Sequence, residues 1–326
     1  MMSLASRRRY GTAIRASQIA SEASIRRLVL DDCDWIVPEI DMKWNVVQPA
    51  AHEWNFAPAD EIVRFAATNA LGVRGHTIAW EQSTPDWAKA AMGEQGGWAV
   101  LERFIASTMS RYADQVAEWD VVNEPIDTDN GADGMRLTSF HRAFGATYVD
   151  RLLRTARGAA PTARLFVNEY GLEYGNHVER DRRARTLRLL RDLRRDGAPI
   201  DGLGIQAHLD LGKGDLAVDE IRDFVRAVAD LGLRVTITEL DVKEHDVTLP
   251  LAERDRLIAE HVRRYLDVVL AEKVVGGVVT WGLSDRDSWL RESDDASRSL
   301  NRGLPFDAAM APKPFYYGMH QAIRLA

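Results

Sequence analysis

Short apolar runs alternate with longer amphipathic segments along almost the whole chain. Each run is rich in β-branched residues and ends on a polar residue, which is typical of a buried strand, and the segment after it has the apolar spacing of a helix. The runs predict eight strands, at residues 10–13, 35–39, 73–80, 119–124, 164–169, 202–208, 235–239 and 277–281. Successive runs lie about 38 residues apart, which is a usual size for one strand–helix unit.

Eight strand–helix units with no break in composition predict one (β/α)8 barrel, the TIM barrel, as a single domain over residues 1–326. A doubly wound parallel sheet is the alternative fold. It would usually have fewer strands and a glycine-rich phosphate-binding turn after the first one, and no G-x-G-x-x-G occurs in this chain.

One predicted helix, at residues 180–195, is dense in arginine. Leu187, Leu190 and Leu193 have the spacing of a single buried face, while aspartates interleave with the arginines and aromatic residues are absent. This pattern indicates the solvated outer face of a barrel helix rather than a surface that binds nucleic acid.

Composition excludes several classes of protein. With 46% apolar and 28% charged residues, the 326-residue chain has the make-up of a folded protein. Its single cysteine, Cys33, excludes an internal disulfide framework and a cysteine-rich zinc site. The 42 basic and 49 acidic residues give a formal charge of −7, which argues against a nucleic-acid partner.

Two further counts concern membranes and ligands. No stretch of about 18 apolar residues occurs, so we expect no membrane span. No apolar run follows Arg7, Arg8 and Arg9 as it would in a secretory signal, and the sequence leaves the protein's localisation open. Nine tryptophans suit a site that stacks on sugar rings and suit a large core equally well.

Polar residues with catalytic potential gather at the predicted strand ends. In a (β/α)8 barrel, the carboxyl ends of the strands surround the mouth where active sites lie. The residues at those ends are Glu39, His76, Trp80, Asn123, Glu124, Asn168, Glu169, Gln206, His208, Glu239 and Trp281. Such a concentration of carboxylates, amides, imidazoles and indoles predicts an enzyme.

Glu124 and Glu239 form the most informative pair. They end the fourth and seventh predicted strands, so they face one ligand from opposite sides of the mouth. Glycoside hydrolysis requires such a pair, because one carboxyl protonates the leaving oxygen while the other attacks C1 or activates water. A single glutamate at a strand end is more often a surface or ion-pairing residue, but Asn123 and His208 beside this pair favour catalysis.

A metal site is the other use of these side chains. His76 and His208 lie on different strands, and neither an H-x-H pair nor an H-E-x-x-H motif accompanies them. We therefore expect neither a metal nor another cofactor.

Seven motifs recur in an order that is characteristic of one family. Residues 38–44, 74–80, 119–125 and 238–241 are similar to P-E-N-E-M-K-W, R-G-H-T-L-V-W, W-D-V-V-N-E-P and T-E-L-D. Residues 281–285 and 288–289 are similar to W-G-x-x-D and S-W, and residues 304–314 resemble the proline-rich ending. Over about residues 10–323 the chain therefore resembles glycoside hydrolase family 10, the endo-β-1,4-xylanases.

The resemblance implies a retaining mechanism on xylan or xylooligosaccharides. Glu124 would be the general acid and then the base, and Glu239 the nucleophile. Asn123 would bind the sugar 2-hydroxyl, His208 would hold Glu239 in place, and Gln206 would lie beside it. The remaining binding residues would be Glu39, Lys43, His76 and Trp80 along the −1 and −2 sugars, with Trp281 and Trp289 covering them. We expect a monomer without cofactor, and members of the family that the chain resembles are usually secreted or periplasmic.

Several positions depart from the family pattern on the side that binds the glycone, the sugars before the cleaved bond. Ile40 replaces asparagine, Asp41 replaces glutamate, residues 81–83 read E-Q-S in place of H-x-Q, and residues 168–171 read N-E-Y-G in place of N-D-Y-N. A site that pairs hydroxyl groups loses discrimination when an amide becomes isoleucine. We therefore expect an altered glycone subsite.

Two alternative functions remain open from the sequence. One is a related hydrolase that acts on another or a decorated β-linked glycan. The other is a non-catalytic carbohydrate-binding barrel, against which the matched carboxylate pair argues because binding alone does not require it.

Overall fold

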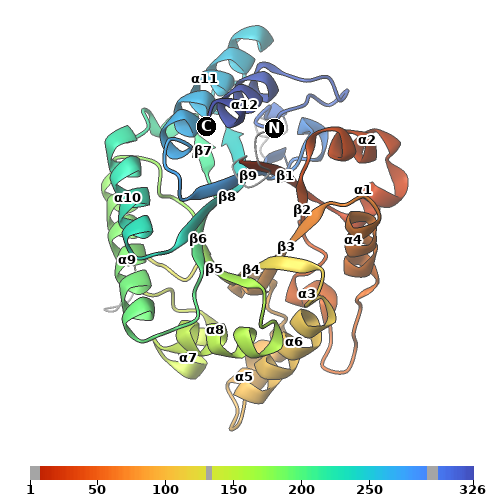
Figure 1. The fold of residues 1–326 in the computed structure, drawn as a ribbon, viewed down its shortest axis with the longest axis vertical. Helices are drawn as coiled ribbons and strands as arrows, with labels where there is room; N and C mark the ends of the chain where they lie inside the picture. Colours follow the sequence, from red (N-terminus) through yellow and green to blue (C-terminus); the bar gives the residue numbers. More distant parts are fainter. Residues whose placement is uncertain (1–7, 130–133, 292–299) are drawn as a thin grey trace, which may run out of the picture.

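A computed structural model describes residues 8–129, 134–291 and 300–326; Arg7 lies outside these ranges. Parallel strands close around a central axis, and helices form a ring outside them (Figure 1). The strands are β1 (Arg9–Ile14), β2 (Trp35–Pro38), β3 (Gly72–Ala79), β4 (Val116–Asn123), β5 (Arg164–Glu169), β6 (Gly202–Ile205), β7 (His208–Asp210), β8 (Arg234–Lys243) and β9 (Val275–Thr280).

The helices lie between the strands in sequence. They are α1 (Ala16–Ser21), α2 (Ala23–Asp32), α3 (Trp44–Val47), α4 (Ala57–Thr68), α5 (Asp86–Met92), α6 (Trp98–Arg111), α7 (Ser139–Phe144), α8 (Tyr148–Ala159), α9 (His177–Arg195), α10 (Val218–Asp230), α11 (Leu251–Val269) and α12 (Pro314–Leu325). Short 3-10 helices occur at Glu81–Ser83, Leu211–Lys213, Asp285–Asp287 and Trp289–Arg291. Of the described helices, none combines the length and apolar character that crossing a bilayer requires.

The barrel closes where the first strand meets the last one. β1 pairs in parallel with β2 on one side and with β9 on the other, and Tyr10 stands opposite Val278 in that closing register. β6 pairs directly with β8, which leaves eight strand positions around the ring. The predicted single-domain (β/α)8 barrel is confirmed.

The sixth predicted strand, residues 202–208, is divided in two. β6 ends at Ile205, and β7 begins at His208 and pairs only with β8. Between them Ala207 has φ 59°, a left-handed conformation that interrupts a strand. This break redirects the chain at the barrel mouth, just where Gln206 and His208 project.

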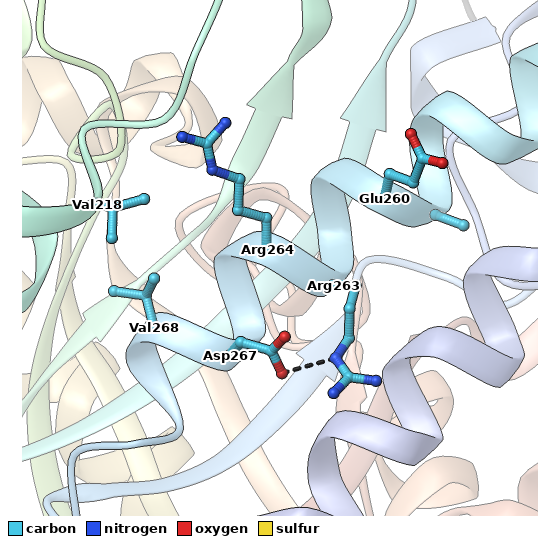
Figure 2. A pocket seen from close by; sticks show the side chains of 7 residues that line it. Val218, Glu260, Arg263, Arg264, Asp267 and Val268 are labelled. Carbon is cyan, nitrogen blue, oxygen red and sulfur yellow. Dashed lines mark hydrogen bonds and ion pairs between the residues drawn. The ribbon is translucent and has the colours of Figure 1, made fainter.

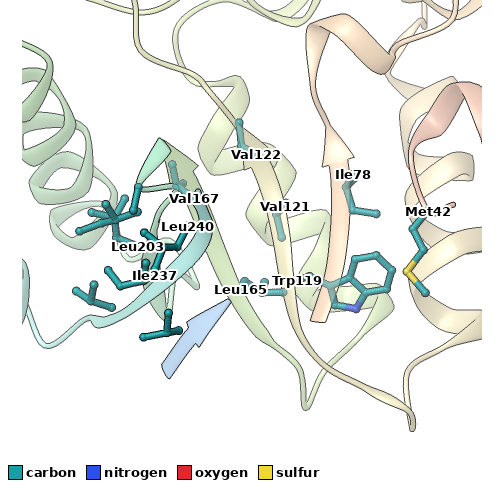
Figure 3. Close-up of a cluster of buried hydrophobic side chains, with 14 of the residues drawn as sticks. Met42, Ile78, Trp119, Val121, Val122, Leu165, Val167, Leu203, Ile237 and Leu240 are labelled. Atoms are coloured by element: carbon teal, nitrogen blue, oxygen red, sulfur yellow. The ribbon is translucent and has the colours of Figure 1, made fainter. Parts of the chain in front are cut away.

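The outward faces of the strands pack against the helices. Figure 3 shows this layer around β4, where Trp119 and Val121 are fully buried. Trp119 lies against β3 at Gly75, where a Cβ atom would come within 2.2 Å of the indole. Only glycine therefore fits at position 75 without moving the tryptophan.

The barrel interior holds charged groups below the mouth. Arg74 of β3 donates to Glu118 of β4 at 2.7 Å and also pairs with Asp120. Arg9 of β1 and Arg164 of β5 donate to the same Glu118 carboxylate at 2.7 and 2.6 Å. Because β1 and β4 are not neighbours, the Arg9–Glu118 bond crosses the interior. Burial raises the pKa of Glu118, but the three guanidinium groups outweigh it and keep that pKa below its ordinary value.

The arginine-rich helix differs from its prediction. In α9, Leu190 and Leu193 are buried and Leu187 is partly buried, as their spacing predicts. The expectation that its arginines face solvent is wrong for Arg182 and Arg183, which are buried because carbonyl and carboxylate oxygens accept their hydrogen bonds.

Candidate active site

One pocket of about 520 Å³ opens at the carboxyl ends of the strands. The eleven residues to which the resemblance assigns roles all line it: Glu39, Lys43, His76, Trp80, Asn123, Glu124, Gln206, His208, Glu239, Trp281 and Trp289. Side chains from strands around the whole ring therefore meet in a single cavity. The strand-end residues Asn168 and Glu169 are buried behind it and do not line it.

A second hollow, lined by Val218 of α10 and by residues of α11, contains none of the predicted site residues (Figure 2). Its charged residues pair locally, with Arg263 bound to Asp267 at 2.6 Å and Arg264 bound to Asp215 at 3.0 Å. The pocket at the mouth is the candidate active site.

A chain of side-chain amides connects the two candidate catalytic carboxylates. Gln206 Nε2 lies 3.3 Å from Glu124 Oε1 and 3.2 Å from Asn123 Oδ1. Asn168 Nδ2 donates to Asn123 Oδ1 at 2.8 Å and to Glu239 Oε1 at 2.6 Å. The Gln206 side chain thus contacts Glu124, although its backbone carbonyl accepts from Glu239 N at 2.9 Å. These amides fix the two carboxylates relative to one another.

A second set of contacts holds the other oxygen of Glu239. His208 Nε2 lies 3.2 Å from Glu239 Oε2, and its Nδ1 lies 2.8 Å from Asp241 Oδ1. Trp289 Nε1 donates to Asp241 Oδ2 at 2.7 Å. Asp241 orients the imidazole because it binds the ring nitrogen that faces away from Glu239.

The charges in this set favour the ionised form of Glu239. Burial lowers the pKa of His208, but Asp241 and Glu239 outweigh burial and hold it well above its ordinary value. Burial raises the pKa of Glu239, but the hydrogen bond from His208 opposes this effect. The resulting pKa of Glu239 is below its ordinary value. A charged imidazole beside a carboxylate stabilises the carboxylate's ionised form.

Glu124 occupies an unusual backbone position. It directly follows the last residue of β4 and has φ 56°, a left-handed conformation that is costly for a non-glycine residue. Its N–H donates to Asn168 O at 2.8 Å, and its carbonyl accepts from Arg136 Nε at 2.9 Å. A residue of strand β5 and a residue of the loop after β4 therefore hold the turn on which Glu124 stands.

An aromatic wall surrounds Lys43. Its Nζ lies 4.6 Å from the centre of the Trp80 ring and 5.8 Å from that of Trp281. His76 packs edge-on against Trp281 at 5.0 Å between ring centres. Burial lowers the pKa of Lys43, against the raising effect of nearby carboxylates such as Glu239.

The residue that neutralises Glu39 is not among those predicted. Arg15 Nε and Nη2 donate to the two Glu39 oxygens at 3.0 and 2.6 Å, in a two-pronged ion pair inside the pocket. Beside this pair Ile40 lines the pocket with 37% of its surface exposed.

Sequence reasoning also missed Asp241, Arg136 and Tyr170, which line the same pocket. Asp241 could have been found, because it lies two residues after Glu239 and so projects from the same face of β8. Arg15 directly follows the end of β1, which is a weaker signal of the same kind. Nothing in the local sequence marks Arg136, which comes from the loop after β4.

The donor set at the site is suited to acid–base and nucleophilic chemistry. Across residues 8–129, 134–291 and 300–326, no group of three or more His, Cys, Asp or Glu side chains is arranged to hold a metal ion. The pocket instead offers one carboxylate, Glu239, bonded to a histidine, and a second carboxyl group, Glu124, on a hydrogen-bonded turn. A pair of carboxyl groups in one pocket is what glycoside hydrolysis requires.

Comparisons with known proteins agree with this chemistry. Endo-1,4-beta-xylanase 1 of Humicola insolens is 32% identical over 297 residues, which cover 87% of this chain and 65% of that protein. Endo-1,4-beta-xylanase B of Paenibacillus barcinonensis is 31% identical over 325 residues, which cover 95% and 93% of the two chains. The crystal structure of xylanase 10B from Thermotoga petrophila RKU-1 in complex with xylobiose matches with a TM-score of 0.85 at 27% identity, covering 100% of this chain and 98% of that one. Since the family model for glycosyl hydrolase family 10 matches residues 2–322, this chain belongs to that family and is a glycoside hydrolase.

Proposed function

We propose that this enzyme hydrolyses internal β-1,4-xylosidic bonds of xylan or xylooligosaccharides with retention of configuration. The observation that carries the proposal is the pair Glu124 and Glu239, linked through amides in one pocket, with His208 bonded to Glu239. The relatives named above are xylanases, and one of their structures contains xylobiose, which supports xylan as the substrate class.

The first chemical step forms a covalent intermediate. A Glu239 oxygen attacks C1 of the sugar in the −1 subsite, and the bond between C1 and the glycosidic oxygen breaks. Glu124 transfers its proton to that departing oxygen, so the leaving sugar departs as a neutral alcohol.

The second step reverses the roles. Glu124, now ionised, takes a proton from water, and the water oxygen attacks C1 from the face that the leaving group vacated. The C1–Glu239 bond breaks, Glu239 becomes a carboxylate again, and the product keeps the β configuration.

Asn123 is suited to binding the sugar 2-hydroxyl. Its Oδ1 already accepts from Asn168 and Gln206, and its Nδ2 lies 3.4 Å from Glu124 Oε1, a long contact. The amide N–H₂ group is therefore the part of Asn123 left to donate to the substrate between the two carboxyl groups. Trp281 and Trp289 supply apolar rings for covering the sugars.

The glycone subsite is proposed to differ from that of the relatives. Both Glu39 oxygens already accept from Arg15, and the neighbouring Ile40 offers no polar atom. Gln82 lines the pocket, whereas Glu81 accepts from Ser139 N and Oγ at 2.8 and 2.7 Å and so stays out of the pocket. Neither Glu39 nor Ile40 therefore offers an uncommitted side-chain hydrogen-bonding group to a glycone sugar.

The test of the proposed function combines two variants with product analysis. Glu239→Ala should abolish turnover of every substrate, because no nucleophile remains. Glu124→Ala should retain activity on aryl xylobiosides with good leaving groups, which need little protonation. Equal loss on good and poor leaving groups would contradict the acid role, and proton NMR showing an α anomer first would contradict retention.

A substrate panel distinguishes the alternatives. Product analysis on unsubstituted and substituted xylans separates a plain xylanase from an enzyme for decorated glycans. Binding of xylooligosaccharide without hydrolysis of xylan or any aryl β-xyloside would favour a carbohydrate-binding barrel.

A further inference from the structure

The turn that carries Glu124 is held through its backbone on both sides of Pro125. Ile126 N donates to Glu169 Oε2 at 3.0 Å. Ile126 O accepts from Arg182 Nη1 and from Arg136 Nη2, each at 3.1 Å. Every polar backbone atom of Ile126 thus bonds to a charged side chain.

Glu169 is the centre of this arrangement. Its other oxygen, Oε1, accepts from Tyr170 N at 3.0 Å and lies 3.5 Å from Arg182 Nη1. Glu169 itself is fully buried and is not among the residues that line the pocket. It therefore does not contact a substrate in the pocket and acts on the reaction through the groups that it holds and through its charge near Glu124.

The position of Glu169 along β5 couples both halves of the site. The preceding residue, Asn168, donates its side chain to Glu239 Oε1 and accepts the Glu124 N–H through its backbone carbonyl. The end of one strand thus holds the nucleophile with one residue and the turn of the acid with the next. The left-handed φ of Glu124 needs such outside support, since the conformation is not intrinsically favoured.

Electrostatics make the carboxyl group of Glu169 a sensitive support. Burial, the largest effect, and the neighbouring Glu124 raise its pKa to about 7, against the lowering effect of the Arg182 charge. Each of the two Glu169 oxygens accepts a backbone N–H, from Ile126 and from Tyr170. An amide cannot replace this carboxyl group, because its NH₂ group would face one of these donors.

We propose that Glu169 is a positioning residue for Glu124, acting through its hydrogen bond to Ile126 N and through Arg182. The inference rests on the proposed function, in which Glu124 donates the proton to the leaving group. Loss of Glu169 should therefore impair proton donation more than nucleophilic attack by Glu239.

The test compares Glu169→Gln with the wild type on two substrates, 2,4-dinitrophenyl β-xylobioside and phenyl β-xylobioside. The first has a good leaving group and needs little protonation, while the second depends on the acid. We expect kcat/KM on the phenyl substrate to fall roughly tenfold further than on the dinitrophenyl substrate, because a displaced general acid loses most of its advantage. Glu169→Asp, which keeps the charge and both oxygens, should recover part of that difference.

Glu173→Gln is the matched control. Glu173 is equally buried, and burial raises its pKa to about 7 as well, but its carboxylate accepts from Leu172 N rather than from the turn of Glu124. This variant should leave the ratio between the two substrates within about twofold of the wild type, even if it lowers stability.

Three results would overturn the proposal: equal loss on both substrates in Glu169→Gln, no loss on either, or the same change of ratio in Glu173→Gln. Should Glu169→Gln fail to fold, the ratio measured for Glu169→Asp decides, and a wild-type ratio there would also overturn it. Glu124→Ala, assayed alongside, shows whether a negative result concerns Glu169 or the proposed function itself. If that variant shows no selective loss on the phenyl substrate, Glu124 is not the acid.

Discussion

His208 shows how one side chain decides the state of another. Its Nε2 contacts Glu239 while its Nδ1 is held by Asp241, and Asp241 is held in turn by the Trp289 indole. Burial lowers the pKa of the imidazole, but both carboxylates outweigh burial and raise that pKa, and the hydrogen bond from His208 in turn favours the ionised form of Glu239. In the proposed mechanism, this arrangement favours Glu239 in the ionised form that a nucleophile requires.

Replacing this imidazole should change the pH profile. In His208→Asn the hydrogen bond that lowers the pKa of Glu239 is lost, while burial continues to raise that pKa. Fewer molecules then hold Glu239 ionised in acid, so the acidic limb of kcat/KM against pH should move to higher pH. The measurement is that profile on an aryl xylobioside.

His261→Asn is the control for this shift. His261 bonds to the Tyr174 hydroxyl at 2.9 Å and is not among the residues that line the pocket. An unchanged acidic limb in His208→Asn, or an equal shift in His261→Asn, would contradict the role given to His208.

A second residue-scale prediction concerns Ile40. An asparagine at this position would supply a hydrogen bond that Glu39, already paired with Arg15, leaves unmade. Ile40→Asn should raise kcat/KM on xylotriose about two- to tenfold, because one net hydrogen bond contributes about 0.5–1.5 kcal/mol.

Restoring the amide at position 83 should not help in the same way. Ser83 is buried, its Oγ lies 3.4 Å from the Trp80 carbonyl oxygen, and it is not among the residues that line the pocket.

The comparison substrate for Ile40→Asn is an aryl β-xyloside, which leaves the −2 subsite empty and should show no gain. A gain on both substrates would place the effect elsewhere.

At this scale the strand pattern identifies residues at the ends of predicted strands. Glu124, Glu239 and His208 end predicted runs, so the period of the strand locates them. Arg15 has only the weak signal of following β1, and Arg136 enters the pocket through the path of the loop after β4, which no local pattern encodes. Their long side chains also allow the charge to act far from the backbone position.

At the scale of elements, one face of a strand contributes both to the charged interior of the barrel and to the pocket. On β3, Arg74 and His76 lie two residues apart and both bond to Asp120 of β4. One face of β3 thus contributes Arg74 to the charged interior and His76 to the pocket. His76 reaches the substrate pocket from a position fixed by interior ion pairs.

Glu118 should be a strong determinant of stability. Glu118→Gln keeps the shape but leaves the cations of Arg9, Arg74 and Arg164 without their shared partner. Breaking a buried ion pair costs about 3–5 kcal/mol, so the free energy of unfolding in urea should fall by that order. The exposed Glu102→Gln serves as the control, and equal stability of the two variants would show that Glu118 contributes little.

The sequence predicts the number and order of elements better than their interruptions. Glycine or asparagine normally marks a residue with a left-handed backbone conformation. The break between β6 and β7 falls at Ala207, which carries no such mark. The sequence therefore predicts one continuous strand up to His208. In α9 the period of the leucines predicts the buried stripe. The burial of Arg182 depends on its bonds to Ile126 and Glu169, residues distant in sequence.

At the scale of the whole molecule, closure of the barrel is what creates the site. Glu39 and Lys43 follow β2, Glu239 belongs to β8, and Trp281 follows β9, yet all line one pocket. A ligand in that pocket contacts strands on both sides of the β1–β9 closure. It binds only when the ring is complete, so binding free energy should add to the stability of the whole fold.

This coupling gives a prediction for the Glu239→Ala variant, which should bind substrate without turnover. Xylotetraose at one hundred times its dissociation constant should raise the free energy of unfolding by about 2.7 kcal/mol, the value for a ligand that binds only the folded state. Urea unfolding followed by tryptophan fluorescence should keep a single transition, since the strands that hold the ligand span the closure of the ring. Maltotetraose, which has α-linked glucose units, should produce no shift. A transition that splits in two with xylotetraose would show that part of the barrel unfolds independently of the ligand, and an equal shift with both sugars would show that the pocket does not select a β-linked chain.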